Sequence, residues 1–183
     1  MNRLSLVLAA ALGLPATSAA TATVITIGNP LAADCFTWAE RRDQRPDALQ
    51  TCSLALKDAL NAENRAATLV NRGVIKMIHS DVRGAEADFD AAIALRPNLS
   101  DAWLNKGFLK LRTGDGSAAL PHLEKALQLR ARRPALAYYA RGIAHEQAGN
   151  TRAAYADLNR ARDLEPGWSM PGQALARYTV VER

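Results

Sequence analysis

Residues 66–99, AATLVNRGVIKMIHSDVRGAEADFDAAIALRPNL, decide the fold because their pattern of small and bulky residues recurs twice along the chain. Residues 100–133 repeat the pattern, and residues 135–168 repeat it again after the single extra Pro134. A fixed period with small residues in register predicts a repeat array. The recurring residues are glycine at the eighth place, alanine at the twentieth and twenty-seventh, and a bulky apolar residue at the twenty-fourth: Gly73, Gly107 and Gly142; Ala85, Ala119 and Ala154; Ala92, Ala126 and Ala161; Phe89, Leu123 and Leu158.

Each copy contains two apolar stripes at helical spacing, which predicts two helices per repeat. Asp81, Asp115 and Asn150 lie between the stripes and are expected to cap the second helix of each copy. The glycine and alanine positions allow the two antiparallel helices to approach closely. A single hairpin of this kind cannot bury its apolar face, so neighbouring repeats are expected to stack.

The period and these residue choices resemble the tetratricopeptide repeat family. The resemblance implies an all-α, right-handed α-solenoid of three helix hairpins. Two departures from the family pattern have structural consequences. Pro97 and Pro166 close the first and third copies, but Ala131 replaces this proline in the second, which predicts an altered joint between copies two and three. The aromatic residue usual at the eleventh place is replaced by Lys76, Lys110 and His145. This replacement predicts that the side chain at this place is partly solvated.

Residues 1–22 are typical of a secretory signal peptide. Arg3 precedes a short apolar core, Pro15 ends it, and small residues follow, with cleavage expected after Ala20 or Ala22. An uncleaved membrane anchor is the main alternative, and a lipoprotein attached at Cys35 is a weaker one. Removal of residues 1–22 lowers the net charge from +5 to +4, without a dense basic block. The sequence therefore predicts a periplasmic or secreted protein without a nucleic-acid partner or stable membrane insertion.

The rest of the chain divides around the three repeats, which are assigned to residues 66–99, 100–134 and 135–168. Residues 23–33 are predicted to be an extended lead-in. Residues 34–65 are predicted to form a degenerate helical hairpin whose first helix is capped by Asp34, and residues 169–183 a terminal capping helix and tail.

Two cysteines are expected to pair within the degenerate hairpin. When Ala48 is aligned with the twentieth place of the repeat, Cys52 takes the twenty-fourth and Cys35 the seventh, and these places face each other across a hairpin. An even number of cysteines in an exported chain favours a disulfide. The alternative is a pair of buried free thiols.

Cations recur at the seventh place of each repeat, and two of them have an acid sixteen residues later. This spacing predicts structural ion pairs between Arg72 and Asp88 and between Arg141 and Asp157. The alternative is a cationic stripe that binds a carboxylate of a partner.

The sequence displays no motif of an active site. His79, His122 and His145 occupy unrelated places in the repeat and show no metal-ligand spacing. We therefore expect no catalytic residues, no bound metal and no cofactor.

The resemblance implies that the first helix of each repeat lines a concave, mostly apolar groove. The alternative is that these residues belong to the core or are covered by the lead-in. The expected partner-binding residues are Val70, Val74, Met77, Asp101, Leu104, Asn105, Phe108, Arg112, Tyr139, Ile143 and Glu146.

These expectations favour a non-enzymatic protein–protein interaction module, an adaptor or scaffold of the bacterial periplasm. Its groove would bind a peptide or helix of an envelope protein. Two alternatives stay open. One is a structural envelope protein that buries the groove against a second copy, and the other is an enzyme, which would need perturbed acids or histidines in the groove.

Overall fold

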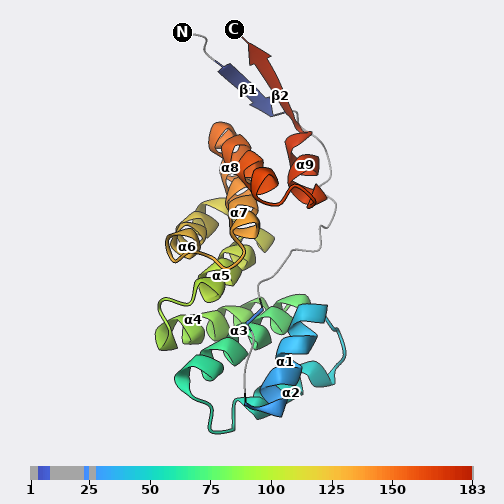
Figure 1. Ribbon diagram of the computed structural model, residues 1–183, viewed down its shortest axis with the longest axis vertical. Helices are drawn as coiled ribbons and strands as arrows, with labels where there is room; N and C mark the ends of the chain where they lie inside the picture. Colours follow the sequence, from blue (N-terminus) through green and yellow to red (C-terminus); the bar gives the residue numbers. More distant parts are fainter. Residues whose placement is uncertain (1–3, 9–22, 25–27, 183) are drawn as a thin grey trace.

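The fold is an all-α solenoid in which helix hairpins follow one another along the long axis of the molecule (Figure 1). The structure is a computed structural model that describes residues 4–8, 23–24 and 28–182. Its helices are α1 (Pro30–Arg41), α2 (Asp47–Ala55), α3 (Ala62–Ile78), α4 (Val82–Leu95), α5 (Ser100–Arg112), α6 (Gly116–Gln128), α7 (Pro134–Gln147), α8 (Thr151–Leu164) and α9 (Ser169–Leu175).

Helix α1 begins earlier than the sequence analysis predicts. Asn29 is its N-cap, with the side-chain oxygen accepting a hydrogen bond from Ala32 N at 2.8 Å, and Pro30 occupies the first helical position. Proline is favoured there because its missing N–H has no intrahelical partner to lose. The predicted cap at Asp34 and the predicted lead-in boundary at residue 33 are therefore wrong, and α1 is a helix of 12 residues.

A disulfide joins Cys35 of α1 to Cys52 of α2, as the alignment with the repeat predicts. Both cysteines are fully buried, and they pack with Ala39, Ala48 and Phe89 in one apolar cluster. The disulfide thus lies where the degenerate hairpin meets the first complete one.

The three complete hairpins are α3–α4, α5–α6 and α7–α8, and each is closed by the glycine at the eighth place. A Cβ atom added at Gly73 would lie 2.5 Å from Phe89 Cε1, and one added at Gly142 would lie 3.0 Å from Leu158 Cγ. The contact at Gly73 is too short for a Cβ atom and the contact at Gly142 would be tight, so the glycine lets the bulky residue of the second helix pack closely onto the backbone of the first.

Two of the three predicted caps make their hydrogen bond. Asp81 accepts from Gly84 N and Asp115 accepts from Ala118 N, each at 2.9 Å. Asn150 occupies the N-cap position of α8 but makes no side-chain capping bond, so the prediction for this residue is wrong.

The joint between the second and third hairpins differs from the equivalent joints, as expected from the missing proline. The residue at the thirty-first place has φ of −138° in Arg96 and −141° in Glu165, but +55° in Arg130. A following proline restricts its predecessor to extended backbone. Ala131 removes that restriction after Arg130, which allows the left-handed turn.

The C-terminal end of the chain differs from the predicted helix and tail. Helix α9 ends at Leu175, and strand β2 (Tyr178–Glu182) follows and pairs antiparallel with β1 (Leu4–Leu8), with Leu6 opposite Val180. Figure 1 shows this two-stranded ribbon beyond α8 and α9. Strand β1 lies within the predicted signal peptide, most of which falls outside the described residues.

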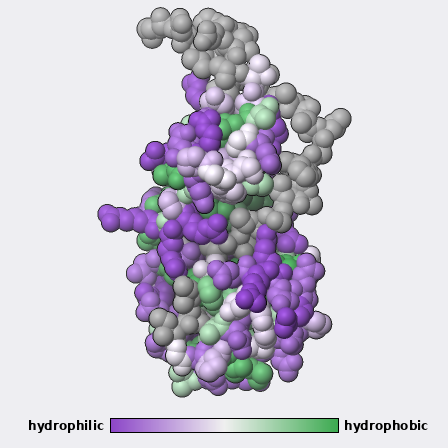
Figure 2. Space-filling model, turned by 45° about the vertical axis from the view of Figure 1, so that its right-hand side comes forward, coloured by the Kyte–Doolittle hydropathy of each residue, from purple (hydrophilic) through white to green (hydrophobic). Residues whose placement is uncertain are grey.

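The face of the molecule drawn in Figure 2 is mainly hydrophilic in the described part. Figure 2 shows a face on which apolar areas are small and separated by polar side chains. Among the helices of the described ranges, none combines the length and apolar character that crossing a bilayer requires.

We expect the disulfide to contribute about 3 kcal/mol to the free energy of unfolding, because it closes a loop of 17 residues in the unfolded chain. Reduction should therefore lower the melting temperature by several degrees. The measurement is thermal unfolding with and without reductant, combined with intact-mass analysis after alkylation. Two alkylated thiols in unreduced protein from an oxidising compartment would contradict the pairing.

Candidate functional site

The apolar residues predicted to line the groove are buried in the structure. Phe108, the expected central anchor, is only 3% exposed and packs with Leu123 and Leu136. This placement corresponds to the alternative in which such residues are core or covered. Val70, Val74, Met77 and Leu104 have exposed fractions of 2% or less.

The remaining predicted residues at the C-terminal end of the face are half-buried. Tyr139 packs against Trp168 with ring centroids 4.9 Å apart, and burial raises the pKa of its hydroxyl. Glu146 accepts hydrogen bonds from Arg177 Nη2 at 2.7 Å and from Tyr178 Oη at 2.9 Å. Burial and the Glu146 carboxylate together raise the pKa of Tyr178. Glu146 therefore fastens the C-terminal segment to α7, and Ile143 is half-buried beside it in the same cluster.

Arg112 is exposed, yet its guanidinium is engaged within the chain. Its Nη1 donates to the carbonyl oxygen of Met77, and its Nη2 donates to Ser80 Oγ at 2.9 Å. A cation at the C-terminal end of a helix is favourable because the last carbonyls carry partial negative charge. Arg112 thus ties α5 to the end of α3.

Asn71 of α3 is not among the predicted groove residues, yet it makes the most informative polar contact of the first helices. Its Oδ1 accepts a hydrogen bond from Val24 N at 2.8 Å, and its Nδ2 donates to Val24 O at 2.7 Å. Asn71 is fully buried and Val24 is 8% exposed. One side-chain amide therefore binds both polar groups of a single peptide residue. The available signal was the asparagine that recurs thirty-four residues later, Asn105.

Asp101 and Asn105 occupy neighbouring turns of α5, the first helix of the next hairpin. Asn105 is fully buried and its Nδ2 donates to the carbonyl oxygen of Asp101 at 2.9 Å. Asp101 is 3% exposed, and its Oδ2 is buried without a hydrogen-bond partner. Burial raises the pKa of the Asp101 carboxyl, although the charges of Arg132 and Arg133 oppose this shift.

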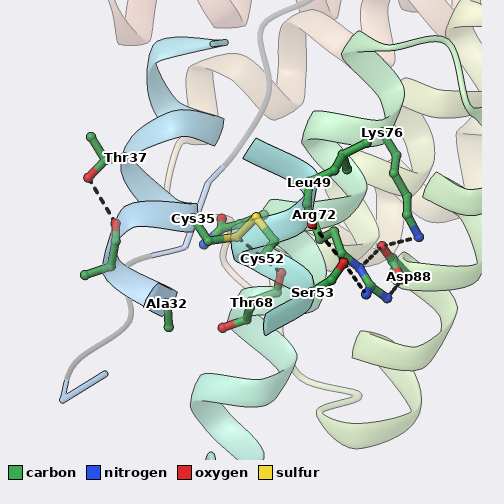
Figure 3. Close-up of a disulfide and its surroundings, with 12 residues drawn as sticks. Ala32, Cys35, Thr37, Leu49, Cys52, Ser53, Thr68, Arg72, Lys76 and Asp88 are labelled. Carbon is green, nitrogen blue, oxygen red and sulfur yellow. Dashed lines mark hydrogen bonds and ion pairs between the residues drawn. A yellow bond between two sulfur atoms is a disulfide. The ribbon is translucent and has the colours of Figure 1, made fainter. Parts of the chain in front are cut away.

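Both predicted ion pairs are present, and each is a bidentate contact between the two helices of one hairpin. Arg72 donates to Asp88 at 2.8 and 2.6 Å, and Arg141 donates to Asp157 at 2.7 and 2.8 Å. The hydrogen bond to Asp157 raises the pKa of Arg141. Figure 3 shows Lys76 reaching Asp88 as well, at 2.8 Å.

The second copy lacks an acid at the matching place and uses the preceding hairpin instead. Lys106 pairs with Asp90 and Lys110 pairs with Glu86, so these cations join α5 to α4. His122, which stands where the other copies have the acid, stacks on Trp103 at 5.9 Å. Burial and the two lysine charges lower its pKa.

Within the described ranges, no three His, Cys, Asp or Glu residues are grouped so that they would hold a metal ion. The polar groups of α3 and α5 that stand out are instead an amide bound to a peptide backbone and a buried carboxyl.

Comparison with known proteins identifies the fold. No protein-family model matches the sequence, and no curated protein matches it either. Solved structures of MamA are similar: the form comprising residue 41 to the end, from Desulfovibrio magneticus RS-1, is 25% identical with a TM-score of 0.64, covering 82% of this chain and 84% of that chain. A MamA RS-1 double mutant is 25% identical (TM-score 0.63; 82% and 83% covered), and a further MamA crystal structure is 21% identical (TM-score 0.62; 77% and 80% covered). What the chain shares with MamA is the helical, tetratricopeptide-like fold.

The Arg141–Asp157 pair should contribute a coupling free energy above the roughly 0–1 kcal/mol of exposed ion pairs, because Asp157 is only 7% exposed. A double-mutant cycle with Arg141→Ala and Asp157→Ala, measured by chemical unfolding, tests this. Lys106→Ala and His122→Ala at the matching places of the second copy are the control, and we expect their effects to be additive within about 0.5 kcal/mol. Additivity at Arg141 and Asp157 would contradict the role of the pair.

Asp101→Asn should raise the melting temperature at neutral pH. Because burial raises the folded-state pKa of Asp101, the folded protein binds its proton more tightly than the unfolded chain does. Ionisation of Asp101 therefore lowers the free energy of unfolding as the pH rises through the unfolded-state and folded-state pKa values. Asn has no charge to bury, so the variant avoids this loss. The advantage of the variant should disappear below about pH 3, where the carboxyl is protonated in both states. A variant less stable than wild type at neutral pH would reveal a stabilising partner for the carboxylate.

Proposed function

We propose that this chain is a non-enzymatic protein–protein interaction module that binds a peptide segment of another protein on its concave face. The observation that carries the proposal is the Asn71–Val24 contact, in which both polar groups of one backbone residue are bound by one buried amide. In extended chain, the N–H and C=O of a residue point to the same side, so a single amide reaches both. Binding of this kind depends on the backbone of the bound residue and does not require a particular side chain.

The buried carboxyl of Asp101 supports the same function. Asp101 lies one helical turn before Asn105, the asparagine that repeats Asn71 in the following hairpin, and its Oδ2 is buried without a hydrogen-bond partner. An unsatisfied buried acceptor is costly, and a peptide N–H would satisfy it. A segment bound at Asn71 and continuing along the solenoid would meet this acceptor next.

We place this activity in the periplasm of a Gram-negative bacterium. The predicted signal peptide of residues 1–22 and the disulfide between Cys35 and Cys52 support an oxidising compartment. Cleavage after Ala22 would retain Val24 in the mature chain and remove Leu4–Leu8, which form β1. Strand β2 would then have lost its partner in the exported form.

Site-specific photo-cross-linking in the periplasm tests the proposal. The photoreactive residue p-benzoylphenylalanine replaces Tyr139, which is half-buried at the edge of the face, and in a control it replaces Arg160, which is exposed on α8. We expect the Tyr139 position to cross-link to one segment of an envelope protein, mapped by mass spectrometry, and the Arg160 position to give no such product. The mapped segment, made as a peptide, should bind the wild-type chain and not Asn71→Leu.

Two results would contradict the proposal. Cross-linking from Tyr139 to a second copy of this chain alone, with a dimer in light scattering, would favour the self-associating structural protein. Equal labelling from Tyr139 and Arg160 would show that the concave face is not the site of interaction.

A further inference from the structure

The lead-in residue Val24 lies on α3 in the manner of a bound peptide. Its backbone is held by Asn71, and its side chain packs among small and branched apolar residues. The other buried residues of this apolar cluster are Ala66, Ala67, Leu69, Val70, Ala92 and Ala102. Val24 is not part of a helix or strand, and among the described residues Asn71 of α3 binds both its backbone N–H and its C=O.

We infer that Thr23 and Val24 are an intramolecular occupant of the Asn71 subsite, which a partner segment has to displace. The inference rests on the proposed function and defines the ligand more closely. The subsite takes an extended backbone that carries a branched apolar residue. Charged residues are disfavoured at this position because Val24 is buried within an apolar cluster, where a charge loses its hydration.

The occupant is held close to its site by the hairpin that follows. Five residues after Val24, Asn29 caps α1 and its Nδ2 donates to Asp58 Oδ2 at 2.9 Å. Helix α1 is fixed to α2 by the disulfide, and Cys35 contacts the carbonyl oxygen of Thr68 on α3. So short a connection gives the segment a high effective concentration at Asn71. A partner can bind only those molecules whose subsite is free of the lead-in. Its apparent affinity is therefore lowered in proportion to the fraction of subsites that remain free.

A second feature indicates that the binding surface continues from Asn71 on α3 to the next hairpin. Asn105 stands at the same place in the next hairpin, and the buried Asp101 Oδ2 beside it has no hydrogen-bond partner. A partner segment that extends beyond the Asn71 subsite could donate a hydrogen bond to Asp101 Oδ2, in addition to forming the two backbone hydrogen bonds with Asn71. This difference supplies the advantage that displacement requires.

The test measures binding of a fluorescent peptide with the sequence ATATVITIG, residues 20–28, to full-length variants by fluorescence polarisation. Val24→Pro removes the N–H that donates to Asn71 while leaving the subsite intact. Val24→Asp places a charge in the apolar surroundings and provides a second way to unseat the segment. We expect both variants to bind the peptide about fivefold or more tightly than wild type, the effect of losing one buried hydrogen bond.

Asn71→Leu should bind the peptide at least fivefold more weakly than Val24→Pro does. The matched control is Asn159→Leu, because Asn159 of α8 bonds only to the carbonyl oxygen of Tyr155 on its own helix. Its peptide affinity should equal that of wild type. Circular dichroism and thermal unfolding establish that each variant is folded.

Equal peptide affinity of wild type and both Val24 variants would overturn the inference, and so would unchanged binding by Asn71→Leu. A wild-type dimer that Val24→Asp converts to a monomer would assign the segment to the site of a second copy and equally overturn it. If the peptide results fail while Tyr139 still cross-links to an envelope segment, the proposed function stands and only the intramolecular occupant is rejected.

Discussion

The structure depends on one close approach, repeated in each hairpin, between a glycine of the first helix and a bulky residue of the second. Gly73 packs against Phe89, Gly107 against Leu123 and Gly142 against Leu158; an added Cβ atom would clash at Gly73 and Gly107 and would be tight at Gly142. This contact fixes the distance between the two helices, so side chains sixteen residues apart meet across it. The bidentate pairs of Arg72 with Asp88 and of Arg141 with Asp157 follow from that geometry. The second helix covers one side of the first, and the residues predicted to line a groove lie on the first helices α3, α5 and α7.

The predicted groove differs chemically from the open apolar surface that the resemblance to the tetratricopeptide repeat family implies. Its large apolar residues are buried, Phe108 included, and two of its polar residues are engaged within the chain: Arg112 binds the end of α3 and Glu146 binds the C-terminal segment. What stands out is the amide of Asn71, which holds a peptide backbone, and the buried carboxyl of Asp101. Recognition through such groups depends on an extended chain more than on a large apolar side chain.

The sequence predicts the features that a fixed period controls and misses those outside it. The hairpins, the pairing of Cys35 with Cys52 and the altered turn at Arg130 follow because each depends on a place within the repeat. The start of α1 was missed because Asn29-Pro30 is equally typical of a turn and of a helix N-terminus. The role of Asn71 could not be predicted, since its partner Val24 lies 47 residues earlier, in a segment without a periodic pattern. Strand β2 was missed for the same reason.

The central claim is that the concave face binds an extended backbone and that Val24 occupies it in the free protein. Residue-resolved amide hydrogen exchange, measured by NMR on the full-length chain, tests this claim most directly. We expect the Val24 amide, which donates to Asn71 Oδ1, to exchange slowly in wild type and rapidly in Asn71→Leu, while amides in the core of α7 stay protected in both. Rapid exchange of the Val24 amide in the folded wild-type protein would contradict it.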